Sequence, residues 1–408
     1  MYKEIEVYEC EFNNEKFYID FSDKEMPVKT KVSDKNIKVK VFPTLKTDSP
    51  YFVIYVTDMC NMNCSYCFNK MGTIHRSEKE PTYSIDALIK FFENLEVKDI
   101  NIRFFGGEPT LNTEWIINCV EKLNMLNVNF HYNIFTNGMV LEESFIKFCI
   151  ENNFQFFVSL AFDGEKYKGS LYGKQVEKNV KRLLTYTDNV IGSVVWSAKE
   201  GFSVVSMLEK YSEIGIKYIT LILTWGEQYS VDTHENVKKE LKEIADYYIS
   251  QILNHDSWKI YVHPIIAYLK GMLTGAPGHI DSCACGKNMA SIATNGDIFP
   301  CHCFTAHKGF ESGNINDLKW DMKFSAVDVD MWEPCKECML RYFCKGKCYA
   351  HNYLVNSDVT KADVERCLIE KEVIACCGYI LKKISEKPHE YKALKKIIRM
   401  ENEDNTFH

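Results

Sequence analysis

The stretch that decides the fold reads Tyr51-Phe52-Val53-Ile54-Tyr55-Val56-Thr57-Asp58-Met59-Cys60-Asn61-Met62-Asn63-Cys64-Ser65-Tyr66-Cys67-Phe68. Its first six residues form an apolar run of the kind that builds a buried strand. The cysteines that follow have the spacing C-x3-C-x2-C. Three thiolates on one short loop can hold three irons of a four-iron cluster, because thiolate is the usual protein ligand of iron–sulfur clusters. The fourth iron then has no local cysteine and can bind a small molecule.

Beyond this loop, β-rich apolar runs alternate with helical patterns up to about residue 235. Strands are predicted at 51–57, 100–105, 130–136, 154–160, 190–196 and 218–223. The first helix has Ser84 as its N-cap, and others are predicted at about 113–126, 142–152, 173–186 and 201–214. Six such repeats predict an α/β fold with a parallel sheet, a partial (β/α)6 TIM-like barrel. Ligands bind at the carboxyl ends of the strands in such sheets, where the cysteine loop lies.

The sequence on either side of the six repeats (50–235) has other patterns. Residues 1–49 predict a small N-terminal β segment with a hairpin turn at Asn13-Asn14-Glu15-Lys16. Residues 236–280 are expected to form a helical bridge, and residues 281–370 a cysteine-dense, loop-like domain. Residues 371–408 belong to a C-terminal helix that begins near 362 and is interrupted at Pro388.

Composition excludes several classes of protein. The net charge of −7 argues against a general nucleic-acid partner, which needs a basic surface. The chain lacks the roughly 18 unbroken apolar residues of a membrane span, and its start, Met1–Glu6, does not read as a signal peptide. We therefore expect a cytoplasmic protein with no membrane partner. In a reducing compartment, clusters among its 17 cysteines are more often metal ligands than disulfides.

A second motif, Gly106-Gly107-Glu108-Pro109, follows the strand at 100–105. Glycines let the backbone approach a ligand closely, and Glu108 places a carboxylate at the strand end. Alone, the motif could also be a simple strand-to-helix break. Together with the cysteine loop, it resembles the signature of the radical S-adenosylmethionine (SAM) enzymes.

This resemblance implies a mechanism. Cys60, Cys64 and Cys67 would hold a [4Fe–4S] cluster whose open iron binds SAM, with Tyr66 near the adenine. The motif at 106–109 would bind the SAM amino group. In the family, one electron from the cluster cleaves SAM to methionine and a 5′-deoxyadenosyl radical, which abstracts hydrogen from a substrate.

Two further turns end predicted strands: Thr136-Asn137-Gly138 and Asp163-Gly164. Similar turns surround the SAM pocket in peptide-maturing relatives, although both are also common loop punctuation. Relatives often carry a serine two residues before the second turn and an arginine soon after it. Here Ala161 holds the first position, and the following stretch offers Lys166 and Lys168. Ser159 or one of these lysines is our candidate for holding the SAM carboxylate.

The carboxy-terminal part contains the pattern Cys335-x2-Cys338-x5-Cys344-x3-Cys348, followed by Cys367 and preceded by Cys285 and Cys301. This arrangement resembles the SPASM domain of radical SAM maturases, which holds two auxiliary [4Fe–4S] clusters. From spacing alone, two paired-cysteine zinc sites would also fit. The resemblance assigns the outer cluster to Cys335, Cys338, Cys344 and Cys367. It assigns the inner cluster to Cys285, Cys301 and Cys348, with Cys283 as first and Cys303 as second candidate for the fourth ligand. If neither ligates, the inner cluster has an open iron for a substrate group.

The remaining cysteines and one histidine have simpler readings. We expect Cys119, Cys149, Cys376 and Cys377 to be buried small hydrophobes on helices, and Cys10 to lie on a strand. His302 lies between two candidate ligands, where sulfatase-maturing relatives carry a catalytic aspartate. It is either a catalytic group or a residue that caps the loop.

The resemblance implies an oxidoreductase that modifies a peptide. Our hypothesis is a maturase that cross-links a ribosomally made precursor peptide through a thioether or carbon–carbon bond, while an auxiliary cluster accepts the surplus electron. Its partners would be the precursor with its leader and an external one-electron donor such as flavodoxin or ferredoxin. Residues 1–49 could bind the leader by β-augmentation, or a separate protein could. The alternatives are a sulfatase-type maturase that forms formylglycine, and an iron–sulfur electron carrier or binding protein without radical chemistry.

Overall fold

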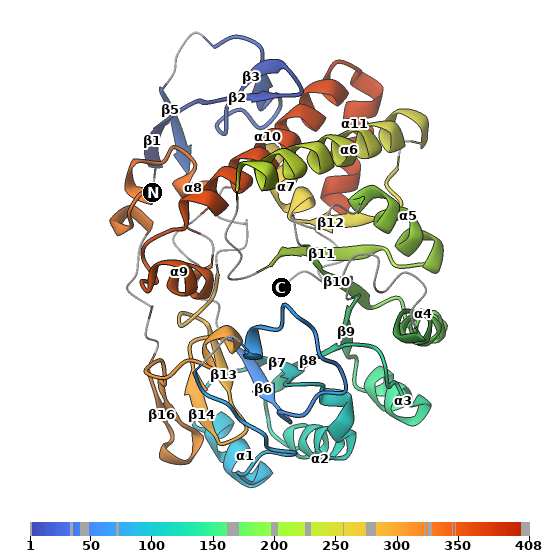
Figure 1. The fold of residues 1–408 in the computed structure, drawn as a ribbon, viewed down its shortest axis with the longest axis vertical. Helices are drawn as coiled ribbons and strands as arrows, with labels where there is room; N and C mark the ends of the chain where they lie inside the picture. The colour runs from blue at the N-terminus through green and yellow to red at the C-terminus, as the bar shows by residue number, and fades with distance from the viewer. Residues whose placement is uncertain are drawn as a thin grey trace.

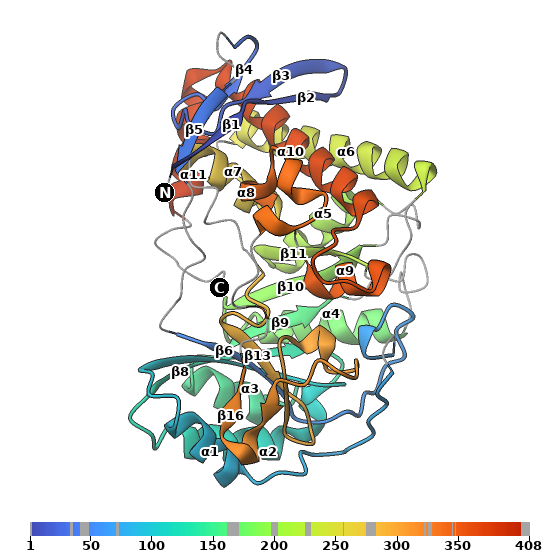
Figure 2. The ribbon, with the colours of Figure 1, turned by 90° about the vertical axis from the view of Figure 1, so that its left-hand side faces the viewer.

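The molecule is organised around one eleven-stranded sheet, with the strands in the order β12-β11-β10-β9-β8-β7-β6-β13-β14-β15-β16. The computed structural model describes residues 2–32, 36–40, 49–70, 73–160, 171–196, 203–224, 230–255, 257–274, 283–321, 324, 329–344, 346 and 348–400. Figures 1 and 2 show the strands and helices of the barrel at one end of the molecule and the small amino-terminal sheets at the other.

The six predicted β/α repeats are confirmed. The strands are β6 (Tyr51–Tyr55), β7 (Asp99–Phe105), β8 (Asn129–Thr136), β9 (Gln155–Ser159), β10 (Val190–Trp196) and β11 (Tyr218–Leu223). Each pairs in parallel with the next. The helices are α1 (Ile85–Glu93), α2 (Thr113–Leu123), α3 (Glu143–Glu151), α4 (Leu171–Leu183) and α5 (Val204–Ile214). The Ser84 side chain caps α1 by accepting from the Ala87 N–H.

Two short strands extend the parallel sheet on either side of the six. β12 (Tyr261–His263) pairs in parallel with β11, and β13 (Met289–Ile292) pairs in parallel with β6. β12 lies between α6 (Val231–His255) and α7 (Ile265–Thr274), inside the segment predicted to be helical. That prediction missed the strand because three residues give no recognisable period. β14 (Asp297–Phe299), β15 (Gly313–Asn314) and β16 (Lys319–Trp320) continue the sheet as antiparallel neighbours.

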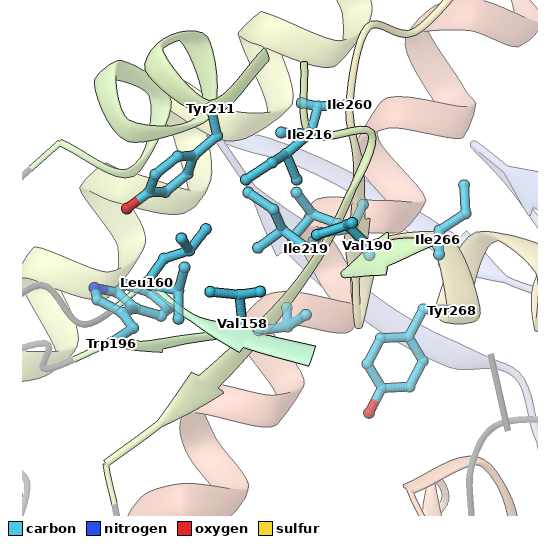
Figure 3. Packing of buried hydrophobic residues seen from close by; sticks show 14 of the residues in the cluster. Val158, Leu160, Val190, Trp196, Tyr211, Ile216, Ile219, Ile260, Ile266 and Tyr268 are labelled. Carbon is cyan, nitrogen blue, oxygen red and sulfur yellow. The ribbon is translucent and has the colours of Figure 1, made fainter. Parts of the chain in front are cut away.

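Side chains of the parallel strands alternate between two environments, because successive residues of a strand point to opposite faces. Phe52, Ile54 and Ile102 belong to the main hydrophobic core, which packs against the helices. Figure 3 shows this packing for β9 to β11, where Val158 and Ile219 lie with side chains from the neighbouring helices and loops. The opposite, inner face carries a smaller cluster of aromatic and aliphatic side chains centred on β6 and β7.

The amino-terminal segment forms two small antiparallel sheets, as predicted. One contains β2 (Tyr8–Phe12), β3 (Glu15–Ile19) and β4 (Val28–Lys29), and the other β1 (Tyr2–Glu6) and β5 (Asn36–Lys40). Asn13 and Asn14 form the hairpin turn with φ of 51° and 61°, a conformation that asparagine tolerates. The first sheet packs on α10 (Val364–Ser385), where a Cβ at Gly378 would lie 2.7 Å from the Phe17 ring.

The carboxy-terminal third is built of short elements until its final two helices. Its 3-10 turns include η5 (His302–Phe304), η7 (Val329–Met331) and η8 (Cys335–Glu337), while η1 (Phe68–Lys70) and η2 (Pro109–Asn112) lie after β6 and β7 in the barrel. η6 (Ile315–Asp317), α8 (Arg341–Cys344) and α9 (Tyr349–Asn356) complete the cysteine-dense region. α10 and α11 (Pro388–Met400) are the predicted terminal helix with its break at Pro388. Within the described residues, no helix is long and apolar enough to cross a membrane.

Candidate functional site

The loop with Cys60, Cys64 and Cys67 lies at the carboxyl end of β6, as predicted. Cys60 is exposed, and the other two thiols are half-buried. Asp58 anchors the start of the loop: its backbone N–H donates to the Glu78 carbonyl at 2.8 Å, and its carboxylate accepts from the Thr294 hydroxyl at 2.8 Å. The loop ends in η1, directly after Cys67. The three cysteines therefore lie on one loop at the carboxyl end of β6, and the charge of Cys67 acts on Cys60; three thiols on one such loop suit a three-thiolate donor set.

Gly106 and Gly107 hold this loop from the neighbouring strand end. The Gly107 N–H donates to the Thr57 carbonyl at 2.9 Å, and the Glu108 N–H donates to the Met59 carbonyl at 2.8 Å. A Cβ at Gly106 or Gly107 would lie 2.2 Å from the same carbonyl oxygens, and Gly106 has a φ of +143°. The sequence predicted close approach to a ligand. In the structure the close approach is to the backbone that leads into Cys60.

The Glu108 carboxylate is buried, with 1% of its surface exposed, and it accepts four hydrogen bonds. Its Oε1 accepts from the Thr110 N–H at 3.1 Å and from the hydroxyls of Thr110 and Thr136, both at 2.7 Å. Its Oε2 accepts from the Asn137 N–H at 2.7 Å. Burial raises the pKa of Glu108, and these donors oppose that rise by favouring the charged form.

The Thr136-Asn137-Gly138 turn is therefore part of the site, as a support for Glu108. Its Asn137 side chain also reaches the cysteine loop, where Nδ2 donates to Asn61 Oδ1 at 2.7 Å and lies 3.9 Å from Cys60 Sγ. Burial raises the pKa of Cys60, and its hydrogen bonds from the Met62 N–H and Asn137 lower it. One turn thus links Glu108 to the first thiol.

The inner face behind the loop is aromatic. The Phe105 ring lies 5.4 Å from Tyr55 and 5.3 Å from Phe135, measured between centroids. His302 completes this cluster, because its ring lies 5.2 Å from Phe105 and 5.5 Å from Phe68. The structure therefore brings His302, from the far end of the chain, against the turn that follows Cys67.

The remaining residues predicted for the SAM site are Tyr66, Ser159 and those around the Asp163-Gly164 turn. Tyr66 is half-buried within the cysteine loop. Ser159 ends β9 on the inner face, where it is half-buried and opposite Ser193 in the parallel register. Ala161, the Asp163-Gly164 turn, Lys166 and Lys168 lie outside the described residues.

Five thiols gather around the inner auxiliary position. Cys301 is the centre: hydrogen bonds from Cys285 and Cys303 lower its pKa well below the usual value, against the effect of burial. Burial raises the pKa of Cys285, which also shares a hydrogen bond with Cys283. Burial, and then the charge of Cys283, raise the pKa of Cys348 to about 12. This donor set fits a four-thiolate cluster, and both candidates for the fourth ligand are present.

Four further thiols gather around the outer position. Burial raises the pKa of Cys335 to about 12, with added contributions from Cys367, Cys344 and Cys338. Burial likewise raises the pKa of Cys367 to about 12, and the charges of Cys344 and Cys338 contribute to this rise. These are the four residues that the resemblance assigns to the outer cluster. All seventeen cysteines are free thiols, so a second four-thiolate donor set is available.

The remaining five cysteines are buried, as expected for small hydrophobes. Cys119 and Cys149 lie in α2 and α3 within the main core. In α10, the Cys376 Sγ donates to the Leu241 carbonyl at 3.3 Å, and Cys377 contacts the Ile265 carbonyl. Cys10 lies on β2, and its Sγ contacts the Phe17 carbonyl at 3.7 Å. They play no part in the site.

Sequence reasoning missed several polar residues that join the site elements. Tyr55, Asn69 and Thr305 meet through hydrogen bonds between the first cysteine loop and η5. Arg103 lies on the inner face, with Cζ 4.1 Å from the Phe157 ring centroid and Nε 2.5 Å from Asn133 Oδ1. Strict alternation of side chains along β6 and β7 predicts that Tyr55 and Arg103 lie on this inner face.

Comparison with known proteins places the site in context. The radical SAM superfamily model matches residues 54–228. The chain is 24% identical over 326 residues to a cysteine-type anaerobic sulfatase-maturating enzyme of Clostridium perfringens (strain ATCC 13124), covering 71% of this chain and 85% of that protein. It is 22% identical over 329 residues to the radical SAM cyclopropyl synthase TigE of Paramaledivibacter caminithermalis, covering 72% and 66%. The solved structure of native anSMEcpe with bound AdoMet and Cp18Cys peptide superposes with a TM-score of 0.65 at 21% identity, covering 88% of this chain and 100% of that one.

Proposed function

Residues 54–228 of this chain form a radical SAM domain of a protein related to the sulfatase maturases, and from that premise we propose that the protein is an enzyme that modifies a peptide by SAM-dependent hydrogen abstraction. The observation that carries the proposal is Glu108. Its buried carboxylate is held by four donors beside the Cys60 loop, and the groups that act on its pKa are these neutral donors and burial. A buried carboxylate in that setting favours an ammonium ligand, such as the amino group of SAM.

The residues have distinct roles in this proposal. Cys60, Cys64 and Cys67 would hold a [4Fe–4S] cluster, which with bound SAM supplies reductive cleavage and hydrogen abstraction. Glu108 binds the amino group and fixes its direction. Thr136 and Asn137 hold the Glu108 carboxylate through hydrogen bonds from β8.

Three further groups of side chains have roles in this proposal. Phe105, Phe135 and Tyr55 line the inner face behind the loop and form an apolar surface that protects a reactive substrate from solvent. Tyr66 is proposed to lie near the adenine. Ser159 is our candidate for the SAM carboxylate, because it ends β9 on this same face.

We assign the two thiol groups of the carboxy-terminal third to auxiliary clusters. Together with the first loop they give three [4Fe–4S] clusters per chain. Forming a new bond from a substrate radical releases one electron, and an auxiliary cluster is a suitable acceptor. We therefore favour a thioether or carbon–carbon cross-link in a ribosomally made precursor peptide, with an external one-electron donor such as flavodoxin or ferredoxin.

Formylglycine formation is the second candidate. It is favoured by the likeness to the cysteine-type sulfatase-maturating enzyme. Position 302 argues against formylglycine formation, because it holds a histidine where the sulfatase-maturing relatives have a carboxylate base. The His302 ring packs edge-on to Phe68. The relation to a cyclopropyl synthase is consistent with carbon–carbon bond formation.

Leader binding is proposed for the ribbon of β1 and β5. Among the described residues, neither strand pairs on its outer edge with a third strand. Such an edge can accept an extended peptide by β-augmentation.

The test begins with SAM cleavage. Anaerobically reconstituted protein, incubated with dithionite and SAM, should release 5′-deoxyadenosine, and a Cys60/Cys64/Cys67→Ala variant should not. Iron content should be about twelve per chain for three four-iron clusters. Wild type that forms no more 5′-deoxyadenosine than the variant would refute the proposal.

Mass spectrometry of a co-expressed candidate peptide then identifies the product. A cross-link removes two hydrogens and keeps the sulfur. Formylglycine formation from cysteine removes the sulfur, so that mass change would select the second candidate.

A further inference from the structure

The Tyr55 hydroxyl is a buried polar group with three polar neighbours. Tyr55 ends β6 and has 3% of its surface exposed. Its Oη lies 3.1 Å from each of Asn69 Oδ1, the His302 carbonyl oxygen and Thr305 Oγ1. A phenylalanine would fill the same space without desolvating a hydroxyl. The hydroxyl is therefore retained for its hydrogen bonds.

These neighbours belong to two turns that each follow a cysteine of a different donor set. Asn69 lies in η1, which begins directly after Cys67. His302 begins η5, which follows directly after Cys301. Tyr55 is thus the hydrogen-bonded link between the first cysteine loop and the inner auxiliary group. Thiols of both groups lie close enough to act on Tyr55. Burial raises the pKa of Tyr55 well above the usual value, and a hydrogen bond with Thr305 lowers it. The charges of Cys303, Cys301 and Cys67 raise it further.

The hydrogen bonds form a connected set. Thr305 Oγ1 donates to the His302 carbonyl at 2.7 Å or to Tyr55 Oη at 3.1 Å. The single Tyr55 hydrogen has two acceptors at equal distance, one in each turn. Asn69 Nδ2 extends the set by donating to the Gly106 carbonyl at 3.4 Å. The glycine turn, η1 and η5 are therefore tied through one tyrosine.

A second contact joins the same two regions further along the chain. The Ile74 N–H donates to the Ala306 carbonyl at 2.8 Å, and the Lys308 N–H donates to Thr73 Oγ1 at 3.4 Å. These contacts align the segments that leave the two turns. Within the turns themselves, the Phe68 ring of η1 also lies 5.5 Å from the His302 ring of η5, and Tyr55 supplies the side-chain hydrogen bonds to both.

We propose that Tyr55 is a positioning residue that fixes the inner auxiliary cysteine group relative to the first cysteine loop. The proposal rests on the proposed function, since both cysteine groups are taken to hold clusters. Tyr55 acts through η1 and η5, which its hydroxyl joins. Its hydroxyl keeps the two groups at one separation, which a transfer of one electron between the substrate and the auxiliary site would require.

The test is Tyr55→Phe in anaerobically reconstituted protein, with Thr305→Val as a second variant at the other end of the link. Tyr51→Phe is the matched control: it removes a hydroxyl from the same face of β6, where Tyr51 Oη donates to Asn133 Oδ1 on β8 at 3.1 Å. The first readout is the distance distribution between the two reduced clusters, measured by pulsed dipolar electron paramagnetic resonance. We expect it to broaden in Tyr55→Phe and Thr305→Val and to match wild type in Tyr51→Phe.

The second readout does not need assembled clusters. Amide hydrogen exchange of residues 67–70 and 302–307 should accelerate together by about fivefold to tenfold in Tyr55→Phe, the effect of losing one buried hydrogen bond in a local opening. The Tyr55→Phe/Thr305→Val double variant should exchange no faster than the faster single variant, because both remove one link. Wild-type exchange in both segments, or acceleration in only one, would overturn the proposal.

These readouts are separate from catalysis. If wild type forms no 5′-deoxyadenosine, the proposed function fails, and the exchange result still decides the role of Tyr55. If SAM cleavage proceeds and exchange is unchanged in Tyr55→Phe, the positioning role fails and the proposed function stands.

Discussion

Thr136→Val should weaken SAM binding strongly while leaving the fold intact. The Thr136 hydroxyl is fully buried, donates to Glu108 Oε1 at 2.7 Å and accepts from the Gly138 N–H at 3.1 Å. Valine has nearly the same shape, so the change removes these bonds and little packing. It leaves the Glu108 carboxylate with three of its four donors and makes its charged form less favourable.

The size of the effect follows from the hydrogen bond that is lost. A hydrogen bond to a charged group is worth about 1.5 to 3 kcal/mol, and each 1.4 kcal/mol is a factor of about ten in affinity. If the loss is expressed fully in binding, the Kd for SAM rises by about 10- to 150-fold. Equilibrium binding to the reconstituted protein, by calorimetry or filtration, measures this directly.

Two controls isolate the role of Glu108. Thr233→Val changes another buried threonine, whose hydroxyl contacts Ser230 at the start of α6, and it should leave the SAM affinity unchanged. A SAM analogue without the amino group should bind wild type and Thr136→Val equally. A Kd for SAM within about threefold of wild type would refute the reasoning that Glu108 binds the amino group through this support.

Three further predictions test other parts of the molecule. Gly107→Ala places a Cβ 2.2 Å from a loop carbonyl and should reduce iron content by about four per chain. Gly309→Ala adds the strain of its own φ of +93° but meets nothing within 4 Å, and it should keep the iron content in the same assay. Burial raises the pKa of Glu370 to about 8, so between about pH 4.5 and 8 the folded protein keeps a proton that the unfolded chain releases, and the free energy of unfolding falls as pH rises through this range. Glu370→Gln should remove this loss. In thermal unfolding, the variant should be more stable than wild type at pH 8 and differ little from it near pH 4.5. Gly378→Val drives a side chain into Phe17 and should undock the amino-terminal sheet, seen as faster proteolysis there with unchanged SAM cleavage.

The local parts of the fold were predictable from the sequence, because each depends on residues close together in the chain. The six apolar strands, the Ser84 cap and the Asn13-Asn14 turn are such features. The C-x3-C-x2-C loop was predictable because its three cysteines lie within eight residues, whereas the two carboxy-terminal thiol groups were expected only from the resemblance to the SPASM domain. β12 and β13 were not, since strands of three and four residues carry no period, and the partner of β13 lies about 240 residues away in β6.

The function of individual polar residues was harder to predict. Glycine at 106 and 107 correctly indicated close approach, but the sequence could not say that the partner is the backbone before Cys60. Tyr55 looked like one more apolar strand residue, because a tyrosine hydroxyl gives no local signal of its partners. His302 was singled out for its place between two cysteines, and its ring contacts with Phe68 and Phe105 depend on the tertiary fold.

The pairing of β13 with β6 sets an order of assembly. During synthesis β6 and its cysteine loop emerge early, but one edge of β6 stays unpaired until residues 289–292 have been made. The same late segment supplies Thr294, which holds Asp58 at the start of the loop. Such a long-range pairing forms slowly, so the first three thiols reach their final arrangement only after β13 and the two inner auxiliary cysteines before it, Cys283 and Cys285, have been made. A chain truncated before this point would carry the complete C-x3-C-x2-C motif on an incompletely built support, so the first cysteine loop would mature together with the carboxy-terminal cysteine region.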